Sequence, residues 1–143
     1  MINIFLLSLL PLACIDYKKQ ILPHEYLGVS LAVALCMFYG AEYDFSTYNV
    51  IITSILVVIL IILPFTGMWG MGDTKLCLIL MLVFSTLDFT YILLTASGLA
   101  ILLNFKNIGT DKLKISFGTY LVIGTFTVHI WNELGLNSIL LSL

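Results

Sequence analysis

Residues 70–75 read Gly-Met-Gly-Asp-Thr-Lys and have long apolar segments on both sides. An aspartate between two segments of this kind is expensive to remove from water, so Asp73 is a candidate functional residue. The two glycines, Gly70 and Gly72, let the backbone turn tightly and let other groups approach closely. The alternative interpretation is a short connecting loop, in which the charged side chains of Asp73 and Lys75 lie in the water of the membrane surface.

The composition of the whole chain resembles that of these apolar segments. Of its 143 residues, 61% are hydrophobic and 10% are charged, and the mean hydropathy is +1.13. A soluble domain has about 25% charged residues, so this chain has too few to cover a water-facing surface and is predicted to lie in a membrane. With about 20 residues for each span, the length accommodates six or at most seven spans in a single domain over residues 1–143. The net charge of -2 says nothing about nucleic acid, but the sequence has no basic patch, so no nucleic-acid partner is expected.

The apolar segments predict an all-α polytopic membrane protein with about six transmembrane helices. These helices are expected over residues 2–16, 26–39, 48–65, 73–84, 90–105 and 117–131. The first and fourth are short for a hydrocarbon core of about 30 Å, so the residues at their ends are expected at or below the membrane surface. Asp88 is predicted to mark a turn, and Gly98 and Gly124 are predicted to be points of close helix packing. Residues 132–143 either lie at the interface or extend the sixth helix.

The distribution of lysines predicts how these helices are oriented. All six lysines fall in the first, third and fifth connections, namely Lys18, Lys19, Lys75, Lys106, Lys112 and Lys114. The charged side chains of the other connections and of the tail are acidic. The positive-inside rule places the lysine-bearing connections in the cytoplasm, so both termini face the outer side. We therefore expect a multi-pass protein of the cell (inner) membrane, surrounded by membrane lipid.

A second aspartate, Asp16, ends the first predicted helix on the same cytoplasmic side as Asp73. Two carboxylates at similar depth share one proton, because like charges a few Å apart do not both ionise cheaply. One then acts as a base toward water and the other as an acid toward a carbonyl, which is aspartyl protease chemistry. Asp16 and Asp73 are therefore the predicted catalytic residues. This chemistry needs no cofactor or metal, and three separated cysteines without a Cys-x-x-Cys pair predict neither zinc nor a disulfide framework.

Three segments resemble those of the prepilin peptidases, and together they extend over about residues 16–124. Residues 16–24 resemble the family's Asp-x5-Ile-Pro-Asn segment, and residues 70–75 resemble its Gly-x-Gly-Asp-x-Lys segment. Residues 115–118 and those that follow resemble the Ile-Pro-Phe-(Ala/Gly)-Pro stretch that opens its last helix. The departures are Leu22 for isoleucine, His24 for asparagine, and Ser116 and Thr119 for prolines. They concern loop detail and substrate preference, and they leave the aspartates in place.

The resemblance implies an intramembrane aspartic endopeptidase that cuts the short basic leader peptide from type IV prepilins or prepilin-like proteins at the cytoplasmic membrane face. The implied partner is such a prepilin substrate, and no oligomeric state is implied. Long bacterial members carry an extra cytoplasmic segment with two Cys-x-x-Cys pairs and also N-methylate the new terminus. Because this sequence lacks that segment, a peptidase without methyltransferase activity is expected.

Five further residues of the matching segments are candidates for contact with the substrate or for shaping the loops. They are Pro23, His24, Gly70, Gly72 and Lys75. Three of them also have an ordinary explanation: Pro23 shapes a turn, His24 is a solvated loop side chain, and Lys75 is a snorkelling anchor at the membrane surface.

Two other functions remain open on the sequence. One is an intramembrane protease of the signal-peptide-peptidase type, but such proteins have more spans and a Pro-Ala-Leu motif that is absent here. The other is a small proton-coupled membrane transporter that uses two carboxylates. Transport carboxylates are expected near the bilayer midplane, whereas Asp16 and Asp73 are predicted at one membrane end.

Overall fold

The structure is a computed structural model that describes residues 2–40, 47–66, 70–105 and 116–135. In chain order its helices are α1 (Ile2–Lys19), α2 (His24–Gly40), α3 (Thr47–Ile62), the 3-10 helix η1 (Leu63–Thr66), α4 (Met71–Val83), α5 (Thr86–Asn104) and α6 (Phe117–Glu133). No strand occurs among the described residues. The prediction of an all-helical protein with six α-helices is therefore confirmed.

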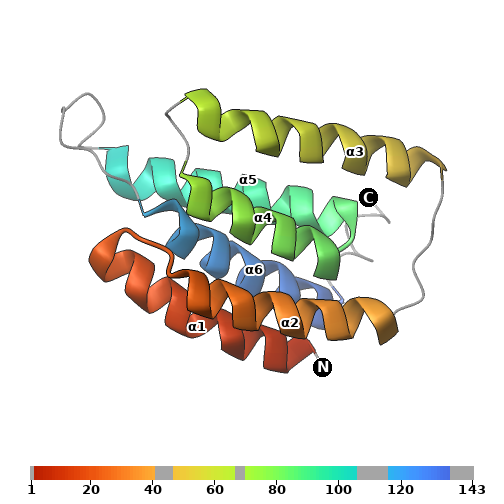
Figure 1. Cartoon of the computed structure of the whole chain (residues 1–143), viewed down its shortest axis with the longest axis horizontal. Helices are drawn as coiled ribbons and strands as arrows, with labels where there is room; N and C mark the ends of the chain where they lie inside the picture. Colours follow the sequence, from red (N-terminus) through yellow and green to blue (C-terminus); the bar gives the residue numbers. More distant parts are fainter. Residues whose placement is uncertain (1, 41–46, 67–69, 106–115, 136–143) are drawn as a thin grey trace.

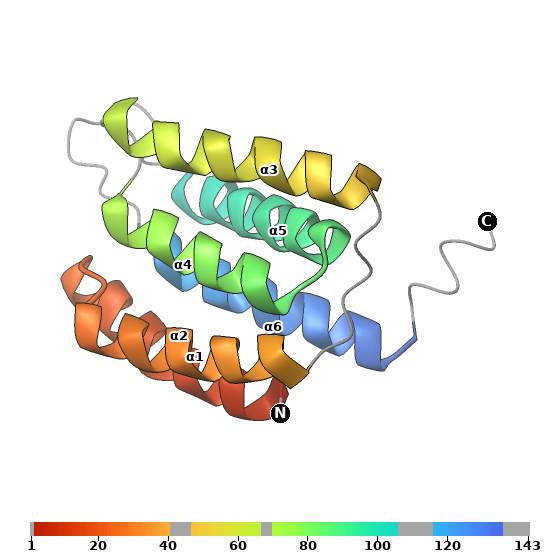
Figure 2. The same ribbon diagram turned by 45° about the vertical axis from the view of Figure 1, so that its right-hand side comes forward.

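Successive α-helices run in alternating directions along one bundle (Figure 1). The C-terminal end of α1 and the N-terminal ends of α2, α4 and α6 therefore meet at the same end of the bundle, on the left in Figure 1. Helix α6 packs along both α1 and α5, whereas α2 packs along α1 and α4. Figure 2 shows α3 at the periphery, beside α4 and α5. This arrangement brings three helix ends from distant parts of the sequence together.

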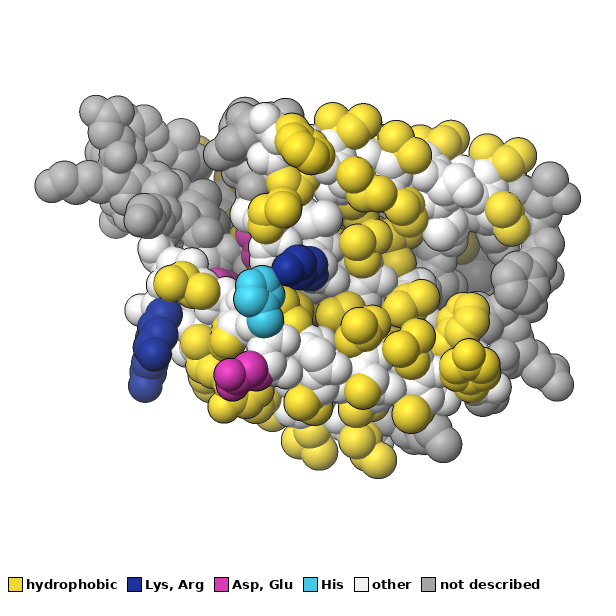
Figure 3. All heavy atoms as spheres, viewed as in Figure 1, with side chains coloured by type: hydrophobic (Ala, Val, Ile, Leu, Met, Phe, Trp, Pro, Cys, Tyr) yellow, Lys and Arg dark blue, Asp and Glu magenta, His cyan; other side chains and the backbone are white. Residues whose placement is uncertain are grey.

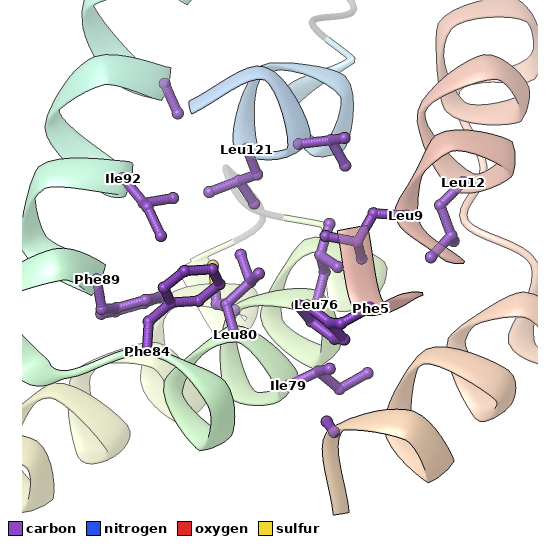
Figure 4. Close-up of a cluster of buried hydrophobic side chains, with 14 of the residues drawn as sticks. Phe5, Leu9, Leu12, Leu76, Ile79, Leu80, Phe84, Phe89, Ile92 and Leu121 are labelled. Carbon is purple, nitrogen blue, oxygen red and sulfur yellow. The ribbon is translucent and has the colours of Figure 1, made fainter. Parts of the chain in front are cut away.

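A buried apolar core holds α1, α4, α5 and α6 in this arrangement (Figure 4). Its largest fully buried side chains include Phe5, Leu9, Leu76, Phe89 and Leu121. The rings of Phe5 and Phe84 pack with their centroids 6.3 Å apart and their planes tilted by 58°, an arrangement that aromatic pairs favour. The core thus positions the ends of α1 and α4, from which the two predicted catalytic residues come.

The start of α5 differs from the prediction. The helix begins at Thr86, with Ser85 as its N-cap, so Asp88 lies in its first turn and does not mark a turn of its own. The Ser85 hydroxyl accepts the backbone N–H of Asp88 at 3.2 Å and donates to its Oδ2 at 2.8 Å. This reciprocal cap satisfies an N–H group that would otherwise have no partner at the helix end.

The two glycines predicted as packing points behave differently. A Cβ on Gly124 of α6 would stand 2.8 Å from the carbonyl oxygen of Ile92 and 2.8 Å from Thr95 Oγ1, both on α5. This close approach of two helices confirms the prediction for Gly124. A Cβ on Gly98 would meet no atom within 4 Å, so the prediction for Gly98 is wrong.

The described surface is strongly apolar. Figure 3 shows hydrophobic side chains over most of the described part of one face of the bundle. Over the described chain as a whole, exposed hydrophobic side chains include Ile4, Ile55, Leu94 and Leu102. By length and composition one described helix, α5, could cross a membrane by itself: it has 19 residues and a hydropathy of 1.7. The described residues contain two shorter apolar helices, His24–Tyr39 and Val50–Phe65. The orientation of the termini stays a prediction, and Lys106, Lys112 and Lys114 lie outside the described residues.

Candidate functional site

The structure brings Asp16 and Asp73 together at one end of the bundle. Asp16 lies in the last turn of α1, and Asp73 lies in the first turn of α4. Both carboxylates face Gly118, the second residue of α6. From the point where a Cβ on Gly118 would stand, Asp16 Oδ2 is 2.9 Å away and Asp73 Oδ1 is 3.2 Å away. Charges on two carboxylates this close interact strongly, so the protonation of one depends on the other.

Asp16 is buried, with 4% of its surface exposed. Its Oδ2 atom lies 2.8 Å from the backbone N of Thr119, 3.1 Å from Thr119 Oγ1 and 3.0 Å from Ser116 Oγ. A buried carboxylate is tolerated when donors of this kind replace the water it has lost. The start of α6 therefore provides the polar partners of Asp16, although Thr119 is 103 positions away from Asp16 in the sequence.

Asp73 is half-buried and accepts hydrogen bonds from the backbone N–H groups of Gly70 and Gly118. The bond from Gly70 is local, because Gly70 is the N-cap of α4 and Asp73 is the third residue of that helix. A carboxylate that reaches back to its own N-cap is one half of a capping box. A Cβ on Gly70 would stand 2.9 Å from Asp73 Oδ2, so a side chain here would displace the carboxylate.

Gly72 allows a second close approach, to the connection between α1 and α2. A Cβ on Gly72 would stand 2.9 Å from Leu22 Cβ. Leu22 is buried, and its Cδ1 atom is also 3.1 Å from the position that a Cβ on Gly118 would take. Leu22 therefore forms an apolar contact beside the aspartates that joins three parts of the chain.

Pro23, His24 and Lys75 lie at or near the starts of α2 and α4. The carbonyl of Pro23 accepts the backbone N–H of Leu27 at 3.2 Å, so Pro23 helps to start α2. The exposed side chains of His24 and Lys75 contact each other, with Nδ1 and Nζ 3.4 Å apart. They line a groove of about 380 Å³ between α2 and α4. The structure thus pairs His24 with Lys75, and among the described residues neither side chain is hydrogen-bonded to Asp16 or Asp73.

Sequence reasoning assigned no role to Ser116, Gly118 and Thr119. Ser116 and Thr119 were visible only as replacements for proline, and a glycine between two hydroxyl residues is a weak signal. Their importance follows from the position of α6 beside α1 and α4. A stronger signal was available in the predicted topology, which starts the sixth helix at the same membrane end as Asp16 and Asp73. The free backbone N–H groups in the first turn of a helix favour carboxylates, so this turn was a candidate partner of the aspartates.

The described residues contain no group of three or more His, Cys, Asp or Glu side chains that could hold a metal ion. The expectation that this site works without a metal or cofactor stays a prediction.

Comparison with known proteins adds one match. Residues 3–105 match the family model described as the type IV leader peptidase family. No curated protein and no solved structure gives a significant match. The matched part includes α1 to α5 up to Asn104 and both aspartates, whereas Ser116, Gly118 and Thr119 lie beyond it.

Proposed function

This chain belongs to the type IV leader peptidase family, and from that premise we propose that it is an aspartic endopeptidase that removes the basic leader from type IV prepilins or prepilin-like proteins. The observation that carries the proposal is the convergence of Asp16 and Asp73 on Gly118. These aspartates come from two helices that are far apart in the sequence, and the same turn of α6 contacts both.

The chemistry follows from two interacting carboxylates of which one is ionised and one is protonated. The ionised carboxylate takes a proton from a water molecule, and the water oxygen bonds to the carbonyl carbon of the scissile peptide. The protonated carboxylate gives its proton to the carbonyl oxygen, which produces a neutral tetrahedral diol. This diol collapses as its C–N bond breaks: the leaving nitrogen takes the proton of the now protonated carboxyl, and a diol hydroxyl gives its proton to the other carboxylate, which restores the starting pair. In this proposal Pro23, His24, Gly70, Gly72 and Lys75 shape the site or contact the substrate.

We place this site at the cytoplasmic face of the cell membrane, with six spans and both termini outside. Support comes from the apolar surface, because exposed patches of this extent are typical of proteins in contact with lipid. At 1.5 Å per residue the 13 residues of α4 extend about 20 Å, less than a hydrocarbon core of about 30 Å. Asp73 at its start then lies below the membrane surface, where a substrate helix ends.

The position of the pair also favours a peptidase over a transporter. Both aspartates lie at one end of the bundle (Figure 1), whereas transport carboxylates are expected near the midplane. The proposed activity is proteolysis without N-methylation of the product, as expected for a sequence without the Cys-x-x-Cys segment.

The proposal is tested by co-expressing the chain with a prepilin and measuring the leader-shortened product by mass spectrometry. The wild-type chain should process the substrate, and Asp16→Asn and Asp73→Asn should each abolish processing, because each removes one half of the acid–base pair. Asp88→Asn is the matched control, since Asp88 also lies in the first turn of a helix but at the opposite end of the bundle. Processing by either site variant at the wild-type rate would overturn the proposal.

A further inference from the structure

We infer that Ser116 and Thr119 are positioning residues, which hold the Asp16 carboxylate in the orientation that the aspartate pair requires. This inference rests on the proposed function, in which Asp16 is one of the two reacting carboxylates. The two residues contact Asp16 and reach the reaction only through it. They lie beyond the residues that match the family, so the match does not assign them a role.

The contacts restrain the rotation of the carboxylate. The Cβ–Cγ torsion of an aspartate is broad and weakly restrained by itself. Here the backbone N of Thr119, its Oγ1 and the Oγ of Ser116 all lie within 3.1 Å of the same atom, Asp16 Oδ2. Three contacts to one oxygen fix which oxygen faces α6 and which faces away. Catalytic groups need to be held within about 0.5 Å of their productive position, and restraints of this kind hold them there.

The two hydroxyls act as a unit. Ser116 Oγ and Thr119 Oγ1 are 2.7 Å apart, and Thr119 Oγ1 is also 3.2 Å from the carbonyl oxygen of Ala13 on α1. Each hydroxyl has one proton to donate. Either both hydroxyls donate to Asp16, or one donates to Asp16 and the other donates to its neighbouring hydroxyl. Removing the Thr119 hydroxyl therefore disturbs the Ser116 contact as well, while the backbone N–H of Thr119 remains.

The same turn of α6 positions both aspartates. Gly118, between the two hydroxyl residues, donates its backbone N–H to Asp73, and the next N–H, from Thr119, goes to Asp16. A shift of Asp16 relative to α6 is thus a shift relative to Asp73. The loss should appear in kcat, which reports the chemical step, and much less in KM, because both hydroxyls are directed at Asp16 and neither lines the groove of His24 and Lys75, the exposed candidates for substrate contact.

The test measures kcat and KM of purified variants on a prepilin substrate. Thr119→Val keeps the shape of the side chain and removes the hydroxyl, and we expect kcat to fall about tenfold to hundredfold, the range for losing a hydrogen bond to a charged group. Thr119→Ser restores the hydroxyl and should recover most of the activity. Ser116→Ala should have a smaller effect, because both donors of Thr119 remain.

Thr125→Val is the matched control. Thr125 is a buried threonine of the same helix, and its hydroxyl donates to the carbonyl of Leu121 at 2.8 Å. It should keep the wild-type kcat. Wild-type kcat in Thr119→Val, a change confined to KM, no recovery in Thr119→Ser, or an equal loss in Thr125→Val would each overturn the inference.

A second readout separates this inference from the proposed function. If the wild-type chain fails to cleave any prepilin, the proposed function fails. The restraint on Asp16 is then still measured by the ¹³Cγ NMR signal that disappears in Asp16→Asn. That signal should shift in Thr119→Val and stay in place in Thr125→Val, and an unshifted signal in Thr119→Val would refute the restraint itself.

Discussion

The starts of α4 and α6 both lie against the aspartate pair, but their backbone N–H groups are satisfied in different ways. At α4 the cap is local: Asp73, in the first turn, accepts the N–H of Gly70, its own N-cap residue. At α6 the N-cap residue Ser116 makes no side-chain cap. The N–H groups of Gly118 and Thr119 are instead capped by Asp73 and Asp16, from two other helices.

This difference explains why the residues that matter at the start of α4 were visible in the sequence and those at the start of α6 were not. A local cap places glycine and aspartate within four residues, and such a cluster in an apolar chain can be recognised by itself. A long-range cap distributes its contacts over residues that are distant in the sequence: Asp16 is 100 positions from Ser116 and 103 positions from Thr119. The residues at α6 are then ordinary small polar residues until the packing of α1, α4 and α6 is known.

The largest effect that sharpens this comparison is expected for Gly118→Ala. The added Cβ would stand 2.9 Å from Asp16 Oδ2 and 3.2 Å from Asp73 Oδ1, so both carboxylates have to move. Misplacement by about 1 Å costs on the order of a hundredfold in rate, and we expect a loss of this size in kcat. Gly98→Ala, on a helix with open space at that position, should keep full activity in the same assay.

Gly118→Ala is informative because the resembling stretch of the prepilin peptidases accepts either alanine or glycine at this position. That stretch has proline where this chain has Thr119, and proline has no N–H to hold a carboxylate. In this chain Thr119 holds Asp16 Oδ2 against α6, so the carboxylate has less room to retreat from a new methyl group. Near-normal turnover of Gly118→Ala would show that the two carboxylates can move away from the added methyl group without losing activity.

How far the sequence predicted this structure depends on the range of the interactions involved. The helices and the two aspartates were predictable, because apolar runs and isolated charges are properties of short segments. The start of α5 was misplaced because the pairing of Ser85 with Asp88 was not recognised as a cap. Gly98 was misjudged because a small residue marks close packing only where a second helix approaches, and that depends on the fold.

The close approach at Gly124 lies away from the aspartates and is expected to affect stability. Gly124→Ala brings a Cβ to 2.8 Å from the backbone oxygen of Ile92, which cannot move without shifting α5. Such overpacking costs about 1–3 kcal/mol, and we expect a lower unfolding midpoint in detergent. Gly98→Ala is the control and should be neutral or stabilising by up to about 1 kcal/mol, because alanine is the better helix former. Equal midpoints for the two variants would contradict the close packing of α5 and α6.

The smallest effect on activity is expected at the start of α5. Like the start of α4, and unlike that of α6, this helix start has a local cap. Ser85→Ala removes the hydroxyl that accepts the N–H of Asp88 and donates to its carboxylate. Losing an N-cap costs about 1 kcal/mol of stability, and the far end of the bundle carries neither Asp16 nor Asp73. Denaturant titration should therefore show a small loss of unfolding free energy, with kcat unchanged.

Thr119→Val should give the opposite pattern, with a large loss of kcat at a similar or smaller cost in stability, because the Thr119 hydroxyl contacts Asp16, which is a reacting carboxylate in the proposed mechanism. The two variants together separate a cap that only stabilises a helix from one that also positions the site. If Ser85→Ala lowered kcat as much as Thr119→Val, loosening any helix start would impair the enzyme. The distinction between local and long-range caps would then have no bearing on catalysis.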